Sequence, residues 1–453
     1  MLDIGAAKTE ITPDRGVRLA GYRARAATAE GAHDPLFSRA IALDDGERGF
    51  VLVALDILAV DEALVAAIRR ETVSHLGRLR ESDVVVCATH THAGPGGIFS
   101  GQADYDRELA GRIVRESAKA AAAAWESRRP GRLGLSACEI HGVACNREEP
   151  PRAFDTLLSG PLLRVMKLED ASGNPVACVI NYACHPTVLD AGNLLFSRDW
   201  PGYAEDMMES SGCPVGMVVF LNGAAADVST RYARRASTFR EAERLGRIVA
   251  EGALSAAGRV EYASPRKISV SSRRLSLPRK PSVSPESAVQ ALARARQELV
   301  SLRDRADVSP GEIRRAESAV LAQEIVLERS RARGEEHHAA AAMNSAGLGD
   351  RLAAELCAVD VQDAVMVFVP GEATARVGER VTQRVSEVRR LGADRIWFVG
   401  YANGHVGYIV DAEAWGKASS SYEALMSRVA PQAAGLIEEE VANLMVKGMS
   451  DGC

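Results

Sequence analysis

The sequence predicts an α/β protein in which mixed β-sheets are layered with helices. Two observations carry this prediction. Short β-branched apolar runs alternate with helical stretches up to about residue 280, and the alternation resumes after a helical interruption. Several apolar runs also end in polar, glycine-containing segments, so a functional site is expected at the strand ends.

The individual elements follow from apolar periodicity. Apolar, β-branched runs predict strands over residues 41–43, 50–55, 84–88, 176–182, 216–221, 364–369 and 396–399. Helical spacing predicts helices over residues 61–79, 104–126, 201–210, 237–257 and 432–446. Residues 265–280 are basic and serine-rich with alternating character, which indicates a strand or a linker.

An antiparallel helical hairpin is predicted within residues 283–340. Residues 284–305 and 309–333 are rich in Ala, Glu, Arg and Leu, and Ser309 followed by Pro310 marks the start of the second helix. Because the α/β pattern resumes afterwards, we interpret the hairpin as an insertion into a single catalytic domain spanning 1–453. It is expected to serve packing or homo-oligomerisation, with His337 and His338 exposed to solvent.

Composition narrows the function classes. A net charge of −5 and a pI near 6.1 do not favour nucleic-acid or anionic-membrane partners. The N-terminus lacks signal-peptide character, and no apolar run is long enough to span a membrane. The eight cysteines are scattered, so we expect free thiols in a cytoplasmic protein, with Cys453 in a frayed terminus. A cysteine nucleophile is a disfavoured alternative.

The segment Thr89-His90-Thr91-His92, followed by Ala-Gly-Pro-Gly-Gly, is the most informative motif. It directly follows the apolar run 84–88. Residues i and i+2 of an extended segment face the same way, so His90 and His92 can address one point. The alternative is a pair of ordinary loop histidines.

Other strand ends also carry reactive side chains. His185 stands before a proline, Ser229 follows a run of small residues, and Glu372 follows a Pro-Gly turn. The structural alternative for Ser229 is a turn or N-cap residue, and the functional one is a nucleophile or a hydrogen-bond donor to substrate. The structural alternative for Glu372 is a residue at the start of a helix, and the functional one is a metal ligand or a general base. Two histidines and a glutamate suit a catalytic zinc, which lowers the pKa of water to about 7. The residues therefore indicate a possible metallohydrolase, although spacing alone leaves their convergence open.

Together these stretches resemble the N-terminal catalytic domain of the neutral/alkaline (non-lysosomal) ceramidase family. The landmarks run in order over most of the chain and include residues 89–97, 146–147, 181–187, 222–229, 370–374, 408 and 421–423. The resemblance implies a Zn²⁺ held by His90, His185, Glu372 and Tyr408, with Tyr401, close by in the sequence, as the alternative to Tyr408. It further implies that His92 and Arg147 line the site and that Ser229 is a nucleophile or a substrate-binding group. We therefore expect catalytic roles for His92, Ser229 and Arg147, and substrate contacts from Gly94, Gly96, Asn222 and Tyr401.

Two departures from the family pattern bear on the substrate. After Ser229 the family usually has Pro-Asn, whereas this chain has Thr230-Arg231. No C-terminal immunoglobulin-like domain is expected after the last predicted helix. These departures favour a soluble or amphiphilic N-acyl substrate over ceramide itself.

The leading hypothesis is a zinc-dependent amidohydrolase that cleaves an N-acyl amide. His92 is expected to shuttle the proton, and Asp199 or Asp56 to orient a zinc-bound histidine. The alternatives are a serine hydrolase that uses Ser229, a true ceramidase acting on lipid, and a non-catalytic relative that assembles through the hairpin.

Overall fold

The computed structural model describes residues 2–147, 161–262, 267–343, 350–361, 363–416 and 421–450. The predictions for the side chains of His337 and His338 and for Cys453 fall outside the described part of the chain. The predicted α/β class with mixed sheets and interleaved helices is confirmed.

The larger sheet has nine strands and mixes parallel and antiparallel pairs. Its order is β11 (Met217–Asn222), β9 (Pro175–Tyr182), β8 (Leu162–Asp170), β6 (Arg129–Glu139), β1 (Leu2–Glu10), β3 (Phe37–Asp44), β4 (Gly49–Leu55) and β5 (Val84–Ala88), with β13 (Glu261–Tyr262) beside β6. The parallel pairs β11/β9 and β4/β5 lie at its two edges, and both β5 and β9 lead into predicted site motifs.

A second sheet of four strands packs against the first. Its order is β14 (Ser269–Pro278), β15 (Arg351–Val361), β16 (Ala364–Phe368) and β18 (Ile396–Val399), and β16 and β18 are parallel. Short parallel or antiparallel pairs extend the framework, namely β17 (Glu372–Ala373) with β19 (Tyr408–Ile409), β7 (Cys145–Asn146) with β12 (Val228–Ser229), and β2 (Gly31–Ala32) with β10 (Leu195–Phe196).

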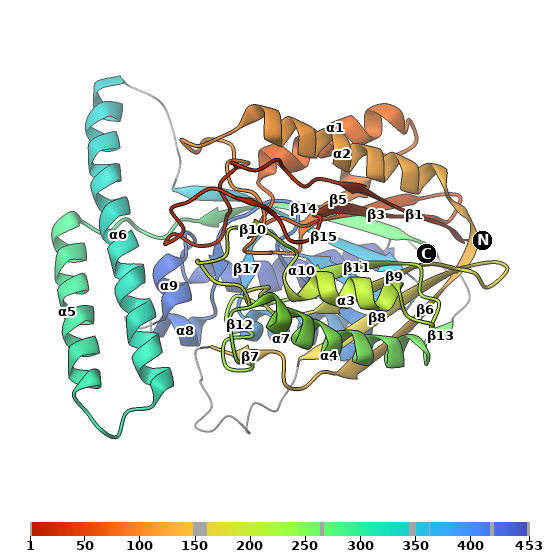
Figure 1. The fold of residues 1–453 in the computed structure, drawn as a ribbon. Coiled ribbons are helices and arrows are strands. Elements are labelled where there is room, and N and C mark those ends of the chain that lie inside the picture. Colours follow the sequence, from red (N-terminus) through yellow and green to blue (C-terminus); the bar gives the residue numbers. More distant parts are fainter. Residues whose placement is uncertain are drawn as a thin grey trace.

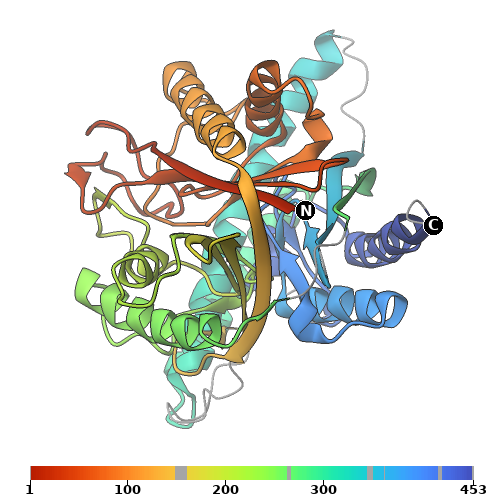
Figure 2. The same ribbon diagram turned by 90° about the vertical axis from the view of Figure 1, so that its right-hand side faces the viewer.

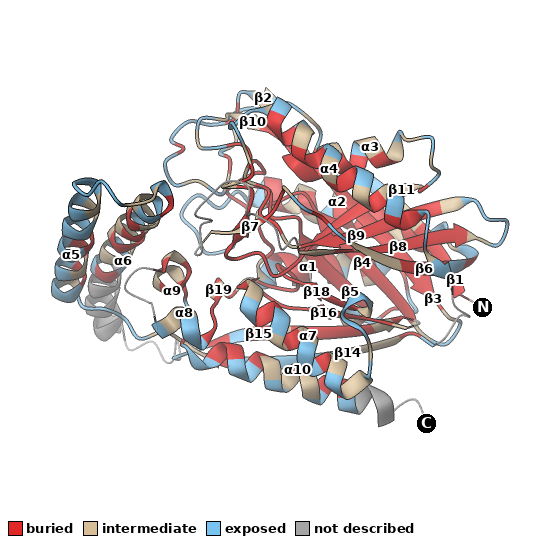
Figure 3. Ribbon diagram, turned by 90° about the horizontal axis from the view of Figure 1, so that it is seen from below, coloured by how far each residue is buried: buried red, intermediate tan, exposed pale blue. Residues whose placement is uncertain are grey.

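Helices cover the outer faces of both sheets, which makes four layers (Figures 1 and 2). The large sheet carries α1 (Glu62–His75) and α2 (Arg107–Glu126) over one half and α3 (Trp200–Glu209) and α4 (Phe239–Ala257) over the other. The small sheet carries α7 (Ala375–Arg389) and α10 (Gln432–Ser450). Figure 3 shows that buried residues fill the space between these layers.

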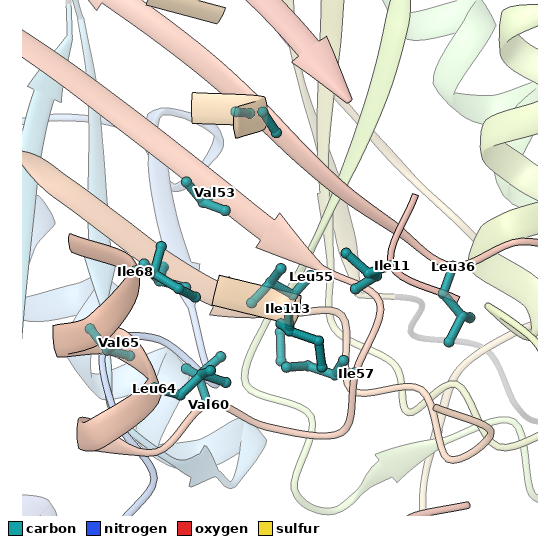
Figure 4. Packing of buried hydrophobic residues seen from close by; sticks show 14 of the residues in the cluster. Ile11, Leu36, Val53, Leu55, Ile57, Val60, Leu64, Val65, Ile68 and Ile113 are labelled. Carbon is teal, nitrogen blue, oxygen red and sulfur yellow. The ribbon is translucent and has the colours of Figure 1, made fainter. Parts of the chain in front are cut away.

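The alternation of side chains along a strand explains the layering. In β4, Val51, Val53 and Leu55 belong to the apolar cluster under α1 and α2, which Figure 4 shows around Val53 and Leu55. Phe50 and Leu52 point the other way, into the cluster shared with the second sheet. Because both faces of β4 are buried, the strand is a continuous apolar run.

The predicted hairpin consists of α5 (Pro285–Arg303) and α6 (Pro310–Met343), which pack side by side at one end of the molecule (Figures 1 and 3). Glu312 caps the start of α6 together with Ser309, whose backbone N–H and hydroxyl both donate to its Oε2 at 2.9 and 2.7 Å. The short helices α8 (Ala412–Gly416) and α9 (Tyr422–Met426) lie near it, and α6 contacts α9.

Candidate metal centre

Strand ends from both sheets meet at one point of the structure. His90 follows β5 and His185 follows β9 of the large sheet, while Glu372 follows β16 of the small sheet. The three side chains are 2%, 1% and 6% exposed. The convergence that sequence spacing left open is therefore present in the fold.

Asn222, at the end of β11, holds the two histidine-bearing segments together. Its Nδ2 donates to the carbonyls of Thr89 and Cys184 at 3.2 and 3.4 Å, and its Oδ1 accepts from the Cys184 N–H at 3.3 Å. The side chain is fully buried. Asn222 is thus a positioning residue in this structure, and its contact with substrate stays a prediction.

Four polar atoms converge at the centre of this arrangement, namely Oε2 of Glu372 and Nε2 of His90, His185 and His92. Oε2 of Glu372 lies 3.4 Å from Nε2 of His90 and 3.6 Å from Nε2 of His185. Nε2 of His92 lies 3.3 Å from Nε2 of His90. The ligand atoms of the three histidines all lie within 4.8 Å of one another, which is compact enough for one metal ion.

Backbone carbonyls set the tautomers of two of these histidines. Nδ1 of His90 lies 2.6 Å from the carbonyl oxygen of Leu58, and Nδ1 of His185 lies 2.5 Å from that of Ala225. Since a carbonyl only accepts, each Nδ1 carries the hydrogen and each Nε2 presents a lone pair. His90 also has a left-handed backbone, with φ of 70°, which turns its ring toward this point.

The expectation that Asp56 or Asp199 orients a ligand histidine is wrong. Oδ2 of Asp56 accepts from Nη1 of Arg39 at 2.9 Å, in a buried ion pair. Asp199 accepts from the backbone N–H groups of Val188 and Trp200 and so shapes the loop after His185. Carbonyl groups of neighbouring loops do the orienting instead, and sequence patterns carry no signal for them.

The donor set fits a zinc ion. Two imidazole lone pairs and a carboxylate oxygen, all acceptors, face one another in a buried space, which is unfavourable unless a cation lies between them. Oε2 of Glu372 has no hydrogen-bond partner of ordinary length among the described residues. Tetrahedral zinc with bonds of about 2.0–2.1 Å places its ligand atoms about 3.3–3.4 Å apart, close to the observed separations.

His92 differs from the other two histidines. Its Nδ1 is buried with no hydrogen-bond partner in the described part of the chain. Metal-bound histidines normally donate their second ring N–H to a carbonyl or carboxylate. This contrast supports the separation of His92 from the ligands His90 and His185, although all three rings are adjacent.

Burial strongly affects the pKa values of His185, His92 and Glu372. It lowers the pKa of His185 to about 4 and, with the neighbouring charges of His90 and His185, holds the pKa of His92 well below its ordinary value. Burial alone would raise the pKa of Glu372, but the closeness of His90, His185 and His405 outweighs burial and holds that pKa well below the usual range. A neutral imidazole and an ionised carboxylate are the forms that bind metal.

Both predicted tyrosines border the centre. Tyr408 stands opposite Glu372 in the β17/β19 pair. Tyr401 stacks on the ring of His90 with centroids 4.1 Å apart, and its hydroxyl is buried with no hydrogen-bond partner in the described chain. Tyr401 is fully buried beside the predicted ligand His90, and its contact with substrate stays a prediction.

Arg147 and Ser229 lie on the side of His185. Nε of Arg147 donates to Oε1 of Glu423 at 2.7 Å; burial lowers the pKa of Arg147, but the charges of Glu423 and Tyr408 outweigh it and raise that pKa well above the usual range. Ser229 forms a β-bridge with His185, and its Oγ accepts from the N–H of Arg231 at 3.3 Å. Among the described residues no imidazole or carboxylate bonds to that Oγ, so nothing there would activate it as a nucleophile.

The two glycines predicted to contact substrate, Gly94 and Gly96, lie close to neighbouring backbone, and their contact with substrate stays a prediction. A Cβ on Gly94 would meet the Asp56 carbonyl oxygen at 3.1 Å, and one on Gly96 would meet the Arg18 carbonyl oxygen at 3.2 Å. Gly96 also donates its N–H to Arg18 at 2.7 Å. These glycines let the motif loop lie close to neighbouring backbone, which is their structural use here.

Sequence reasoning missed the groups that surround the ligands. Nε2 of His405 lies 3.7 Å from Oε1 of Glu372, whereas His90 and His185 pair with Oε2 of that carboxylate. Gly21 and Tyr22 cover His92, and the rings of Tyr22 and His92 lie 5.0 Å apart. The position of His405 after strand β18 was the available signal, but only the nearby tyrosine was singled out.

The comparisons with known proteins agree with the predicted resemblance. Residues 2–218 match the family model described as neutral/alkaline non-lysosomal ceramidase, N-terminal. The chain is 27% identical over 217 residues to the neutral ceramidase of Pseudomonas aeruginosa, an alignment covering 44% of this chain and 32% of that protein. It is 26% identical over 225 residues to the neutral ceramidase of Mycobacterium tuberculosis, covering 45% and 35%.

Solved structures extend the likeness in fold to nearly the whole chain. The crystal structure of the Pseudomonas aeruginosa neutral ceramidase matches with a TM-score of 0.74 and 20% identity, covering 99% of this chain and 75% of that chain. A ceramidase in complex with C2 matches with a TM-score of 0.75 and 18% identity over the same shares. The sequence alignments span about a third of the length of the curated relatives. In the described part of the chain, no helix is both long and apolar enough to cross a membrane.

Proposed function

Because residues 2–218 match the neutral/alkaline non-lysosomal ceramidase family, we propose that this chain is a metal-dependent hydrolase of the amide bond in a ceramide-like N-acyl amphiphile. One observation carries the proposal. The lone pairs of His90 and His185 converge with Oε2 of Glu372 at 3.4 and 3.6 Å, and both Nδ1 atoms are committed to carbonyls.

We assign the cation as zinc, held by His90, His185 and Glu372, with Tyr408 as the fourth ligand. The ligand types support this choice, since catalytic zinc commonly takes two histidines and a glutamate. When bound, zinc supplies Lewis acidity and makes water a nucleophile near neutral pH. The negative charge of Glu372 reduces the net charge of the buried centre.

The remaining residues act on the amide. His92 is adjacent to the metal ligands and neutral, so its imidazole accepts a proton during attack and returns it to the leaving amine. Ser229 offers its hydroxyl to the amide oxygen from the His185 side, and Arg147, fixed by Glu423, keeps that side positive. Glu423 is thereby a positioning residue.

The alternatives make separate predictions. A Ser229 nucleophile requires an acyl-enzyme, yet no base contacts Ser229 among the described residues. A non-catalytic relative has no need for two imidazole nitrogens and a carboxylate oxygen that face one another in the interior. The substrate class rests on the named relatives, which are neutral ceramidases, so ceramide itself is one of the substrates to be tested.

The experiment combines metal analysis with hydrolysis assays on ceramide and shorter N-acyl amides. We expect about one zinc per chain and release of fatty acid that stops in strong chelator and returns with zinc. Glu372→Gln and His90→Ala should lose both metal and activity. His141→Ala, which changes an exposed histidine near Glu139, is the control and should keep both.

Two outcomes would overturn the proposal. One is full activity in protein that holds no metal, and the other is a Glu372→Gln variant that retains wild-type metal content and rate. Trapping of an acyl adduct on Ser229 would replace the proposed chemistry with the serine mechanism.

A further inference from the structure

A cavity of about 830 Å³ lies between helix α7 and the end of the large sheet where β8 begins and β9 ends. Its volume is within the range of about 300–1,000 Å³ that is typical of small-molecule sites. Among the described residues that line it, none belongs to the metal centre or has a role in the proposed hydrolysis. The cavity is therefore a second candidate binding site, separate from the first.

Small side chains create this space. Ala375, Gly378 and Thr382 follow one another at the three- and four-residue spacing of a single face of α7, and all three line the cavity. A Cβ added to Gly378 would clash with Cβ of Ala224, so the glycine lets α7 approach the loop after β11 closely. Much of the remaining described lining is apolar, namely Leu162, Ala183, Ala224, Val228 and Phe398. Such a lining favours an apolar ligand chain, whose transfer out of water is favourable.

One cation at the cavity wall has no carboxylate partner. Arg164 of β8 lines the cavity, and its Nε and Nη2 donate to the carbonyl oxygen of Ala393 at 3.0 and 2.9 Å. Among the residues that the structure describes, no carboxylate lies within 4.0 Å of this guanidinium, and nearby Asp394 pairs with Arg395 at 3.2 Å. A backbone carbonyl accepts hydrogen bonds but carries no net charge, so the positive charge of Arg164 lacks a counter-charge.

The acids in the described lining are already engaged. They are Glu379 and Glu387, both exposed on α7. Oε2 of Glu379 accepts from Nη1 of Arg376 at 3.1 Å, and Oε1 of Glu387 accepts from Nε2 of Gln383 at 3.0 Å. Of the charged residues in this lining, Arg164 is therefore the one left without a charged partner.

A ligand carboxylate would compensate the charge of Arg164. Burial lowers the pKa of this guanidinium to about 10, although the charge of Asp394 acts to raise it, so Arg164 stays protonated at neutral pH. A partly buried cation is costly until an anion pairs with it. A guanidinium binds a carboxylate through two parallel N–H···O bonds, which fix the position of the anion. An apolar cavity with one such group suits a ligand with an apolar chain and an anionic head.

The cavity shares a loop with the metal centre. Ala224 and Val228 line the cavity, while the carbonyl oxygen of Ala225 lies 2.5 Å from Nδ1 of His185 and that of Val228 accepts from the His185 N–H at 3.0 Å. A ligand in the cavity thus contacts the backbone that orients a proposed metal ligand. We propose that this cavity binds the fatty acid released by amide hydrolysis, with its apolar chain along α7 and its carboxylate on Arg164.

The choice of a fatty acid rests on the proposed function, since cleavage of an N-acyl amphiphile releases one. Calorimetric titration of the full chain compares decanoate with decan-1-ol, which share a chain and differ in the head group. Excess acetohydroxamate occupies any metal ion at the other site, so that carboxylate binding there does not contribute. We expect decanoate to bind at least about tenfold more tightly than decan-1-ol, and Arg164→Gln to abolish the difference.

Two tryptophan variants of α7 locate the site. Thr382→Trp places a large ring in the cavity and should weaken binding of both ligands about tenfold or more. Arg380→Trp is the matched control, because Arg380 lies on the same helix but pairs with Glu438 of α10 at 3.8 Å and is not in the cavity lining. It should bind both ligands as the wild type does. Thermal unfolding of each variant checks the fold.

Photolabelling locates the ligand without a variant. A decanoate analogue with a diazirine at the chain end should label residues 375–387 or 223–228. Equal affinities of the wild type for decanoate and decan-1-ol, wild-type binding by Thr382→Trp, or labels confined to residues 90–92 and 405–408 would overturn the inference. Hydrolysis without binding in the cavity would leave the proposed function intact. Binding in the cavity without hydrolysis of any amide would support the fatty-acid site while the proposed function fails.

Discussion

Gly21→Ala tests the position of His92 without changing a reactive group. Gly21 has φ of +95°, and a Cβ added there would lie 2.6 Å from Cγ and Nδ1 of the His92 ring, where 3.4 Å is ordinary contact. The ring or the loop must therefore move by about 0.8 Å, because a packed interior has no free space to absorb the methyl group.

The loss of folding stability caused by Gly21→Ala has two parts, backbone strain and overpacking, and a matched variant separates them. Alanine at positive φ is strained by about 1–2 kcal/mol, and Gly16 has the same φ of +95° with nothing within 4 Å of its added Cβ. Gly16→Ala thus carries the strain alone. Gly21→Ala adds overpacking of about 1–3 kcal/mol, so its free energy of unfolding should fall below that of Gly16→Ala by that amount.

The assay is single-turnover amide hydrolysis with metal content measured in parallel. A displacement near 1 Å costs on the order of a hundredfold in rate, so Gly21→Ala should be about a hundredfold slower than Gly16→Ala. Zinc content should stay at the wild-type level, because His90 and His185 are untouched. Rates within twofold of each other would refute the role of His92, and loss of zinc from Gly21→Ala would show that His92 is a ligand.

Further predictions concern the framework around the ligands. Asn222→Ala leaves the buried groups of Thr89 and Cys184 unpaired, so we expect a loss of about 3 kcal/mol in denaturant unfolding and weaker zinc binding; an unchanged midpoint would contradict this. His405→Gln removes the ring beside Oε1 of Glu372 and should weaken zinc about tenfold or more in competition with a chelator, with little change in the unfolding midpoint. Zinc affinity should fall by no more than about tenfold between pH 7 and 5.5, whereas two ordinary histidines would give about a hundredfold. The reason is that burial lowers the pKa of His185 to about 4, so protons compete at that ligand only near pH 4; a hundredfold loss, measured by chelator competition across pH, would contradict it.

Periodicity predicted elements whose two faces differ in a regular way or are both apolar, whereas β1, β6 and β8 in the middle of the large sheet were not predicted. The strands β4 and β5 and the helices α1 and α2 are among the predicted elements. β6 was not predicted, since it begins with exposed Arg129 and Pro130, and Gly131 and Gly134 interrupt its apolar residues. The helix α7 was missed because its apolar residues are spaced among many charges.

The candidate site was predictable where a side chain has distinctive chemistry. His90, His185 and Glu372 stand out from apolar strands, and the structure brings them together. Contacts made by backbone groups were not predictable, because a carbonyl such as that of Leu58 or Ala225 exists at every position and gains its role only from the fold. The roles of Gly94 and Gly96 likewise depend on how closely two loops pass.

The two β-sheets each contribute to the metal centre, with His90 and His185 from the large sheet and Glu372 from the small one. An ion bound there would therefore connect the two sheets across their interface. Its binding would raise the free energy of unfolding by about 2.7 kcal/mol when zinc is present at a hundred times its dissociation constant. In the proposed zinc-bound protein, the free energy of unfolding would therefore rise with zinc concentration and fall when a chelator removes the ion.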